Sequence, residues 1–199
     1  MKIVVTGHTS GIGKSILETL EGQGHEVIGL SRATGHDLEK DYELVYNSIL
    51  DTDPDVFINN SYVPENQTKL LREVYDKWKY KNKIIINIGS VASLIPPDNP
   101  DYNMPYAKDK RSQREFCQNE NFLYSKKNYN KVKCGISNIN CDYVKTMFKS
   151  KYDKRLFPNL DPKEVANVVL YIIYSIKQGV CIREINLHST KKPELIEEK

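Results

Sequence analysis

The chain begins with a short apolar run that stops at a glycine-rich turn. The apolar residues 3–5 are followed by Gly7, Gly11 and Gly13, and a helix-compatible segment begins at once. This order is typical of a parallel strand that passes into a helix, whose free N–H groups can hold a phosphate. The turn therefore favours an α/β fold that handles a nucleotide or a dinucleotide.

The same turn is compatible with two kinds of phosphate site. The spacing of Gly7, Gly11 and Gly13 suits the pyrophosphate of a dinucleotide, whereas the Gly-Lys-Ser that begins at Gly13 looks like the end of a P-loop for ATP or GTP. A P-loop needs its first glycine where His8 stands, and the nearest glycine comes one residue too early. The dinucleotide interpretation is favoured, and a P-loop kinase is the weaker alternative.

Strands alternate with helices along the rest of the chain. Strands are expected at 26–30, 55–60, 83–90, 135–139 and 184–187, with a short, weak third strand near Asp37 and Leu38. Helices are expected at 13–23, 42–50, 69–79, from about 105, and from Asp161 to about 174. This alternation predicts a mostly parallel, doubly wound α/β sheet with right-handed crossovers and flanking helices. One domain over residues 1–190 is expected, followed by a charged tail at 191–199.

Composition narrows the function further. The net charge of +3 in 199 residues is small, so no nucleic-acid partner is expected. No apolar run approaches the roughly 20 residues of a membrane span, and the first residues do not resemble a signal peptide. The four cysteines lack a Cys-x-x-Cys pair and the four histidines are scattered, which predicts reduced thiols, a cytoplasmic location and no metal site.

Several segments, in order, resemble the motifs of the short-chain dehydrogenase/reductase family. They are the Thr-Gly-x-x-x-Gly-Ile-Gly turn at 6–13, the Asn-Asn pair at 59–60, the strand that ends in Ser90, the Tyr-x-x-x-Lys of Tyr106 and Lys110, and residues 143–147. The ordered set covers nearly the whole chain. The resemblance implies a Rossmann fold, shortened relative to typical members, and an NAD(P)-dependent oxidoreductase acting on a small carbonyl or alcohol.

The resemblance also implies catalytic roles. Tyr106 would be the acid-base; Lys110, one helical turn later on the same face, would lower the tyrosine pKa from its free value near ~10 and bond the nicotinamide ribose. Ser90 would orient the substrate oxygen. Asn66 is the candidate for the family's fourth residue, a proton relay, although it could equally be a helix N-cap. Tyr102 competes with Tyr106 but has no lysine partner at the same spacing.

The end of the second predicted strand favours NADP(H) over NAD(H). Ser31 and Arg32 stand there, with no acid to bond the ribose hydroxyls, and arginine can pair with a 2′-phosphate. Asp37 and Leu38 resemble the family's adenine-contacting pair, although Asp37 could instead cap a helix. The predicted cofactor-binding residues are Gly7, Thr9, Ser10, Gly11, Ile12, Gly13, Ser31, Arg32, Asp37, Leu38, Asn59, Asn60, Ser61, Tyr106, Lys110, Val144 and Thr146.

Some positions depart from the family pattern. Tyr62 stands where the family's Asn-Asn-Ala-Gly has glycine, and Cys141 with Asp142 replaces the usual Pro-Gly. These departures keep open a second hypothesis, a non-catalytic dinucleotide-binding sensor or scaffold of the same fold. The short substrate loop favours an open pocket or one completed by a partner subunit, and the resemblance is compatible with a homo-oligomer, a dimer or a tetramer.

Overall fold

The core of the molecule is one parallel sheet. The computed structural model describes residues 1–126, 133–142, 144 and 160–190. Six strands pair in the order β2-β1-β3-β4-β5-β6, and every pairing is parallel. The strands are β1 (Lys2–Thr6), β2 (Glu26–Leu30), β3 (Val56–Asn59), β4 (Ile84–Ser90), β5 (Gly135–Cys141) and β6 (Glu184–Leu187). The doubly wound parallel sheet expected from the sequence is confirmed.

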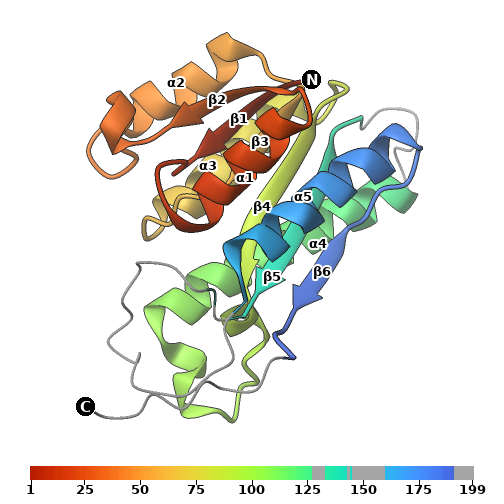
Figure 1. The fold of residues 1–199 in the computed structure, drawn as a ribbon. Coiled ribbons are helices and arrows are strands. Elements are labelled where there is room, and N and C mark those ends of the chain that lie inside the picture. The colour runs from red at the N-terminus through yellow and green to blue at the C-terminus, as the bar shows by residue number, and fades with distance from the viewer. Residues whose placement is uncertain (127–132, 143, 145–159, 191–199) are drawn as a thin grey trace.

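Helices cover both faces of this sheet (Figure 1). The α-helices are α1 (Gly11–Gly22), α2 (Tyr42–Thr52), α3 (Asn66–Trp78), α4 (Pro105–Lys126) and α5 (Pro162–Lys177). Three short 3₁₀ helices lie in the connections, at η1 (Arg32–Thr34), η2 (Val91–Leu94) and η3 (Pro100–Asn103). The α5 terminus follows the expectation, because Asp161 accepts the N–H of Lys163 and forms a capping box with Glu164.

The strand expected near Asp37 and Leu38 is wrong. Both residues lie in an irregular segment after η1, where the Asp37 carboxylate accepts the N–H of Glu39. The Leu38 side chain is 4% exposed and packs with the core beneath α2. As a result β2 is the edge strand on this side of the sheet.

Alternate residues of each strand point to opposite faces, so the sheet separates two apolar clusters. On one face, Ile3, Val5 and Ile86 pack against α1 and α5. On the other face, Phe57 and Ile85 pack against α2, α3 and α4. Because both faces are covered, the strands consist largely of buried apolar residues, as parallel strands usually do.

The second face becomes polar toward the carboxyl ends of the strands. In β3, β4 and β5, an asparagine stands two residues after the buried Phe57, Ile85 and Ile136. The strand register places Asn59 beside Asn87 and Asn87 beside Asn138. We call Asn59, Asn87, Asn138 and Asn140 the amide row. All four are at most 1% exposed. The row marks the boundary between the apolar core and the carboxyl edge of the sheet.

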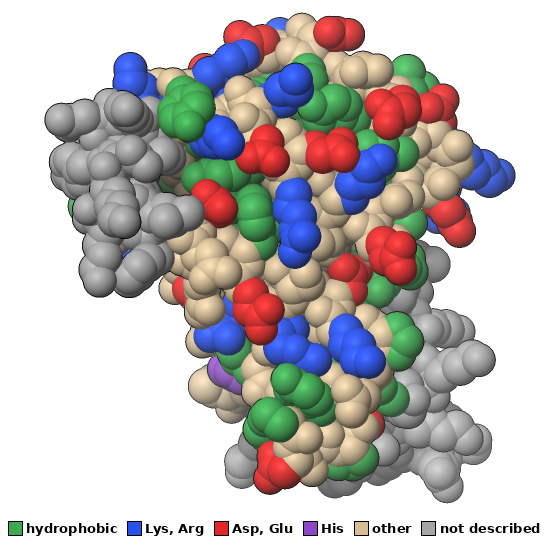
Figure 2. All heavy atoms as spheres, turned by 180° about the vertical axis from the view of Figure 1, so that it is seen from behind, with side chains coloured by type: hydrophobic (Ala, Val, Ile, Leu, Met, Phe, Trp, Pro, Cys, Tyr) green, Lys and Arg blue, Asp and Glu red, His purple; other side chains and the backbone are tan. Residues whose placement is uncertain are grey.

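The surface carries charges of both signs. Figure 2 shows acidic and basic side chains interspersed on the rear face. Within the described residues no helix is long and apolar enough to cross a membrane. All four cysteines are unpaired, three of them buried and Cys181 exposed. Thr146 and the tail at 191–199 lie outside the described residues.

Candidate active site

The glycine turn joins β1 to α1 and tolerates no side chain at its narrowest point. A Cβ on Gly13 would lie 2.1 Å from the carbonyl oxygen of Gly7, which no real Cβ approaches. Gly7 and Gly11 have φ values of 71° and 53°, in the region that favours glycine. Ser10 occupies the N-cap position of α1 without a side-chain hydrogen bond, so the side chain does not cap the first-turn N–H groups. This turn fits a pyrophosphate at a helix N-terminus.

The position of Lys14 does not support a P-loop. Its Nζ lies 3.6 Å from Glu18 Oε1, and both side chains are more than half exposed on the outer side of α1. A P-loop lysine has to reach the phosphates from within the turn. Thr9 and Ser10 are exposed at the turn itself, and Ile12 is half-buried against the α1 and α5 cluster.

The ends of β1 and β3 hold the turn in place. Thr6 Oγ1 accepts the N–H of Asn60 at 3.0 Å and that of Ser61 at 3.1 Å. The Asn60 amide donates back to the carbonyls of Thr6 at 2.9 Å and Gly7 at 3.3 Å. Asn59 instead points into the interior, where it belongs to the amide row. Of the predicted Asn-Asn pair, Asn60 therefore contacts the turn and Asn59 does not.

The end of β2 lies beside the same turn. The Gly7 N–H donates to the Leu30 carbonyl at 2.8 Å, and Ser31 beyond it is buried. The ring of His8 lies over Gly29, and a Cβ there would be 2.2 Å from His8 Cγ. Within the part of the chain that the structure describes, the buried His8 Nδ1 has no hydrogen-bond partner. An exposed Arg32 follows, so polar groups lie beside the glycine turn at this edge of the sheet.

Tyr106 and Lys110 come together on the first turns of α4. Tyr106 is 39% exposed, whereas Lys110 is 3% exposed. Lys110 Nζ lies 5.7 Å from the centroid of the Tyr106 ring. The same nitrogen donates to Gln67 Oε1 at 2.6 Å, to the Ile88 carbonyl at 3.2 Å and to Gln113 Oε1 at 3.4 Å. The two residues that sequence spacing paired are thus neighbours, one buried and one open to solvent.

Burial is the main influence on the lysine. It lowers the pKa of Lys110 from 10.5 to about 8, against the opposing effects of Asp109 and Cys141. Because neutral pH is below this value, most Lys110 side chains carry a positive charge there. A positive charge beside a tyrosine favours its phenolate form.

Tyr62 is also part of this site. Its ring packs edge-on against the Tyr106 ring with centroids 4.9 Å apart, and Lys110 Nζ lies 4.9 Å from the Tyr62 centroid. Burial, followed by Asp109 and Tyr106, raises the pKa of Tyr62 to about 12. The Tyr62 hydroxyl therefore stays protonated at neutral pH. In the sequence, Tyr62 was noted only because it stands in place of a glycine. Its contact with Tyr106 of α4 joins residues far apart in the sequence, so no local pattern predicts it.

Ser90 ends β4 on the same edge of the sheet. Its Oγ accepts the N–H of Ala92 at 3.1 Å and so begins η2. Ser90 thus lies at the carboxyl end of β4, at the start of η2. Val144, beyond β5, forms an isolated parallel bridge with Leu160.

The structure does not bring Asn66 to Lys110. Asn66 Nδ2 donates to the Leu38 carbonyl at 2.8 Å, away from α4. The next residue, Gln67, makes the contact with Lys110 instead. Helical periodicity could have found it, because Gln67 shares its buried face with Leu71, Val74 and Trp78, whereas Asn66 lies off that face.

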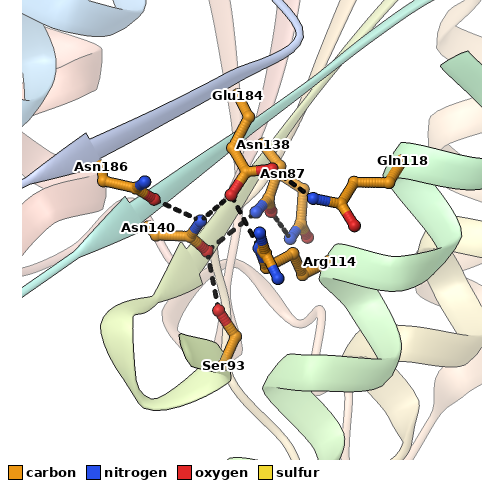
Figure 3. A network of polar contacts seen from close by, with 8 residues as sticks. All are labelled: Asn87, Ser93, Arg114, Gln118, Asn138, Asn140, Glu184 and Asn186. Carbon is orange, nitrogen blue, oxygen red and sulfur yellow. Dashed lines mark hydrogen bonds and ion pairs between the residues drawn. The ribbon is translucent and has the colours of Figure 1, made fainter. Parts of the chain in front are cut away.

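From Asn87, the amide row extends to β6 at the far edge of the sheet (Figure 3). Asn87 donates to Asn138 at 2.8 Å, Asn138 to Asn140 at 2.8 Å, and Asn140 to Glu184 at 2.9 Å. Glu184 also accepts from Arg114 and Gln118 of α4, each at 2.7 Å, while Ser93 of η2 and Asn186 of β6 bond Asn140. Toward the site, Asn87 donates to Gln113 Oε1 at 3.2 Å.

Comparisons with known proteins agree with this geometry. Residues 3–69 match the model of the NAD dependent epimerase/dehydratase family. No curated protein matches the chain in sequence.

Similar solved structures cover the whole fold. The closed form of a serine dehydrogenase complexed with NADP⁺ has a TM-score of 0.72 at 20% identity, over 100% of each chain. The 3-ketoacyl-(acyl-carrier-protein) reductase from Brucella melitensis, complexed with NADH, has a TM-score of 0.73 at 13% identity, over 95% of this chain and 97% of the other. The 3-alpha-hydroxysteroid dehydrogenase from Pseudomonas sp. B-0831, also complexed with NADH, has a TM-score of 0.72 at 16% identity, over 94% and 95%.

The sheet order, the glycine turn and the flanking helices define a protein with the Rossmann fold. Within that class, the likeness extends over nearly the full length of the chain to structures of dehydrogenases and reductases. The chain has the fold of the short-chain dehydrogenases/reductases, as the sequence motifs predicted.

Proposed function

We propose that this protein is an NADP(H)-dependent oxidoreductase that transfers a hydride between the nicotinamide and a small carbonyl or alcohol. The observation that carries the proposal is the buried Lys110, whose Nζ lies 5.7 Å from the ring centroid of the partly exposed Tyr106. The similar structures that are complexed with NADH or NADP⁺ support a nicotinamide dinucleotide as the cofactor.

Residues on three strand ends would hold the dinucleotide. The N–H groups at the start of α1 would bind the pyrophosphate, and Gly13 keeps that approach open. Asn60 and Ser61 would line the middle of the site. Arg32, exposed next to the buried Ser31, would pair with a 2′-phosphate through charge-assisted hydrogen bonds, which favours NADP(H). Leu38 packs in the core, so at most its backbone and Asp37 remain for the adenine.

The catalytic work of the protein is proton transfer. Bound NADPH supplies the hydride and with it the two electrons that reduce the carbonyl carbon. The Tyr106 hydroxyl donates its proton to the carbonyl oxygen, and the resulting phenolate is stabilised by the charge of Lys110. The Ser90 hydroxyl donates a hydrogen bond to the same oxygen and fixes its position. In alcohol oxidation the proton returns to Tyr106.

The test compares Tyr106→Phe with Tyr102→Phe in NADPH oxidation over a panel of small aldehydes, ketones and keto acids. Tyr102 lies under the guanidinium of Arg111, 3.6 Å from ring centroid to carbon, and is the matched control. Tyr106→Phe should lower kcat by roughly 10²–10⁴-fold, the usual contribution of a general acid. NADPH affinity, measured by fluorescence titration, should change by less than about threefold, and Tyr102→Phe should retain activity.

Two results would overturn the proposal. Turnover retained by Tyr106→Phe would exclude Tyr106 as the acid. If the wild type binds NADPH tightly but oxidises it with none of the carbonyls, the protein is a dinucleotide sensor and not an enzyme of this kind.

A further inference from the structure

We infer that Gln67 is a positioning residue that fixes the Lys110 ammonium and keeps it charged. It is distinct from Asn66, the amide that the sequence singled out. The inference rests on the proposed function only in assigning a catalytic role to Lys110. The hydrogen bond itself is a property of the fold.

The surroundings of Lys110 Nζ match an ammonium group. An ammonium has three donors and no acceptor. Three oxygens accept from it, and the Gln67 Oε1 contact, at 2.6 Å, is shorter than those to Ile88 at 3.2 Å and Gln113 at 3.4 Å. Among the described residues no carboxylate forms an ion pair with this nitrogen. Amide and carbonyl dipoles therefore take the place of a counter-ion.

The orientation of the Gln67 side chain is determined by its other end. Its Nε2 donates to two backbone carbonyls, those of Asn59 at 3.0 Å and Ile88 at 3.3 Å. A flipped amide would place its oxygen against two acceptors and its NH₂ against the ammonium. The network thus leaves one orientation, in which Oε1 faces Lys110.

Helix α3 is itself attached to α4 beside this contact. The Asp109 carboxylate accepts the Glu65 N–H at 3.3 Å and the Thr68 hydroxyl. Gln113 Nε2 donates to Thr68 Oγ1 at 3.1 Å and to Gln67 Oε1 at 3.3 Å. The first turn of α3, which carries Gln67, is thereby held against the turn of α4 that carries Lys110.

Four other groups face the lysine. Asp109 precedes it on α4 and favours the charged form of the lysine, whereas Cys141, on β5, does so only as a thiolate. Burial raises the pKa of the Cys141 thiol to about 12, so that thiol is neutral at pH 7. The rings of Tyr62 and Tyr106 cover the remaining side.

Removing the Gln67 oxygen removes the shortest hydrogen bond to the charged form while the burial remains. The pKa of Lys110 should then fall further, and the nitrogen should become neutral near pH 7. A neutral Lys110 does not stabilise the Tyr106 phenolate. A carboxylate at the same place should have the opposite effect on Lys110.

The experiment is a ¹³C NMR titration of the lysine Cε resonances in the full chain, with Lys110 assigned from the spectrum of Lys110→Arg. Gln67→Leu should lower the Lys110 pKa by about one unit or more, which is a tenfold change in its acid dissociation constant, and Gln67→Glu should raise it by a similar amount. The matched control, Asn66→Ala, should leave the titration midpoint unchanged. In the same variants, the pH midpoint of alcohol oxidation should rise for Gln67→Leu.

The titration tests the role of Gln67, and the activity assay tests the proposed function, so the two claims can be refuted independently. A Lys110 midpoint that is the same in wild type, Gln67→Leu and Gln67→Glu would overturn the inference, whatever the activity. Shifted midpoints in a protein that oxidises no alcohol would support the role of Gln67 and refute the proposed function. If Gln67→Leu does not fold, as judged by circular dichroism, Gln67→Glu against Asn66→Ala decides the matter by the same readout.

Discussion

Replacing Asn87 by alanine should destabilise the fold by about 3 kcal/mol. The Asn87 side chain is fully buried in the middle of the amide row. Its oxygen accepts from Asn59 at 2.9 Å, and its nitrogen donates to Asn138 at 2.8 Å and to Gln113 at 3.2 Å. Truncation to alanine removes all three hydrogen bonds at once.

The size of this loss in unfolding free energy depends on which neighbours of Asn87 keep a hydrogen-bond partner after the truncation. Asn59 keeps its bond to the Gln67 carbonyl at 3.1 Å, and Gln113 keeps Lys110 at 3.4 Å. Asn138 Oδ1 is left without the partner that the structure gives it. One stranded buried acceptor costs roughly 1–3 kcal/mol, and the small cavity adds on the order of 1 kcal/mol.

A control variant at the exposed end of the same network distinguishes the loss of buried hydrogen bonds from the loss of an exposed one. Asn186 accepts from Asn140 at 2.8 Å but is exposed, and Asn140 retains Glu184 when Asn186 is truncated. Asn186→Ala should therefore cost less than about 1 kcal/mol. Equilibrium urea unfolding, followed by tryptophan fluorescence and circular dichroism with m-values compared, measures both variants. Equal losses for Asn87→Ala and Asn186→Ala would refute the argument from burial.

Three further outcomes are expected. Gly13→Ala should abolish dinucleotide binding in calorimetric titration and cost roughly 1–3 kcal/mol in urea unfolding, because the new Cβ would lie 2.1 Å from the Gly7 oxygen. Arg32→Ala should weaken NADPH binding by roughly tenfold or more and NADH binding by less than about threefold, since only NADPH carries the 2′-phosphate; equal losses for both cofactors would contradict that role. The pKa of Lys110 is lowered to about 8 from its ordinary value of 10.5, so the folded state releases its proton first as the pH rises. The free energy of unfolding, measured relative to Lys110→Met, should rise by roughly 3 kcal/mol between about pH 8 and pH 10.5, and a flat difference would show that the lysine is not buried as a cation.

The sheet was predictable because its strands are covered on both faces and therefore appear as apolar runs bounded by turn residues. The strand expected at Asp37 and Leu38 rested on one apolar residue between polar ones. The structure buries the Leu38 side chain beneath α2 from an irregular segment, so no strand is needed to bring it into the core. A signal of this length does not distinguish a strand from a loop that inserts one side chain into the core.

The parts of the site that depend on local geometry were also predictable. The need for a glycine at position 13 is predictable because the helix must pack closely on the turn before it. The proximity of Tyr106 and Lys110 is predictable from helical spacing. Asn66 was chosen by residue type, whereas its orientation depends on helical phase, which places Gln67 on the buried face instead. The contact of Tyr62 with Tyr106 joins segments far apart in the sequence, so no spacing reveals it.

The amide row illustrates a third case, in which the residues are visible in the sequence but their meaning depends on strand register. Asn59, Asn87 and Asn138 each follow an apolar residue by two positions, and only the pairing of β3, β4 and β5 shows that they are neighbours. Two residues after Asn87, on the same face of β4, is Gly89, where a Cβ would lie 2.8 Å from the side-chain oxygen of Asn140 and 2.9 Å from that of Asn138. A side chain at this position would have to displace the amides of Asn138 and Asn140, which occupy the space.

The row also explains how this fold accommodates a charged lysine in its interior. Three residues of one stretch of α4 make the connections: Lys110 at the site, Gln113 between the site and Asn87, and Arg114 with Glu184 at 2.7 Å. A buried cation is tolerated when dipoles that cannot rotate away face it, and the hydrogen-bonded amides hold one another in place. The apolar half of the same sheet face, below the row, contributes the burial that offsets the cost of these polar groups. The polar half therefore fixes α4 against the sheet at several points, and the positions of Tyr106 and Lys110 follow from the register of the strands beneath them.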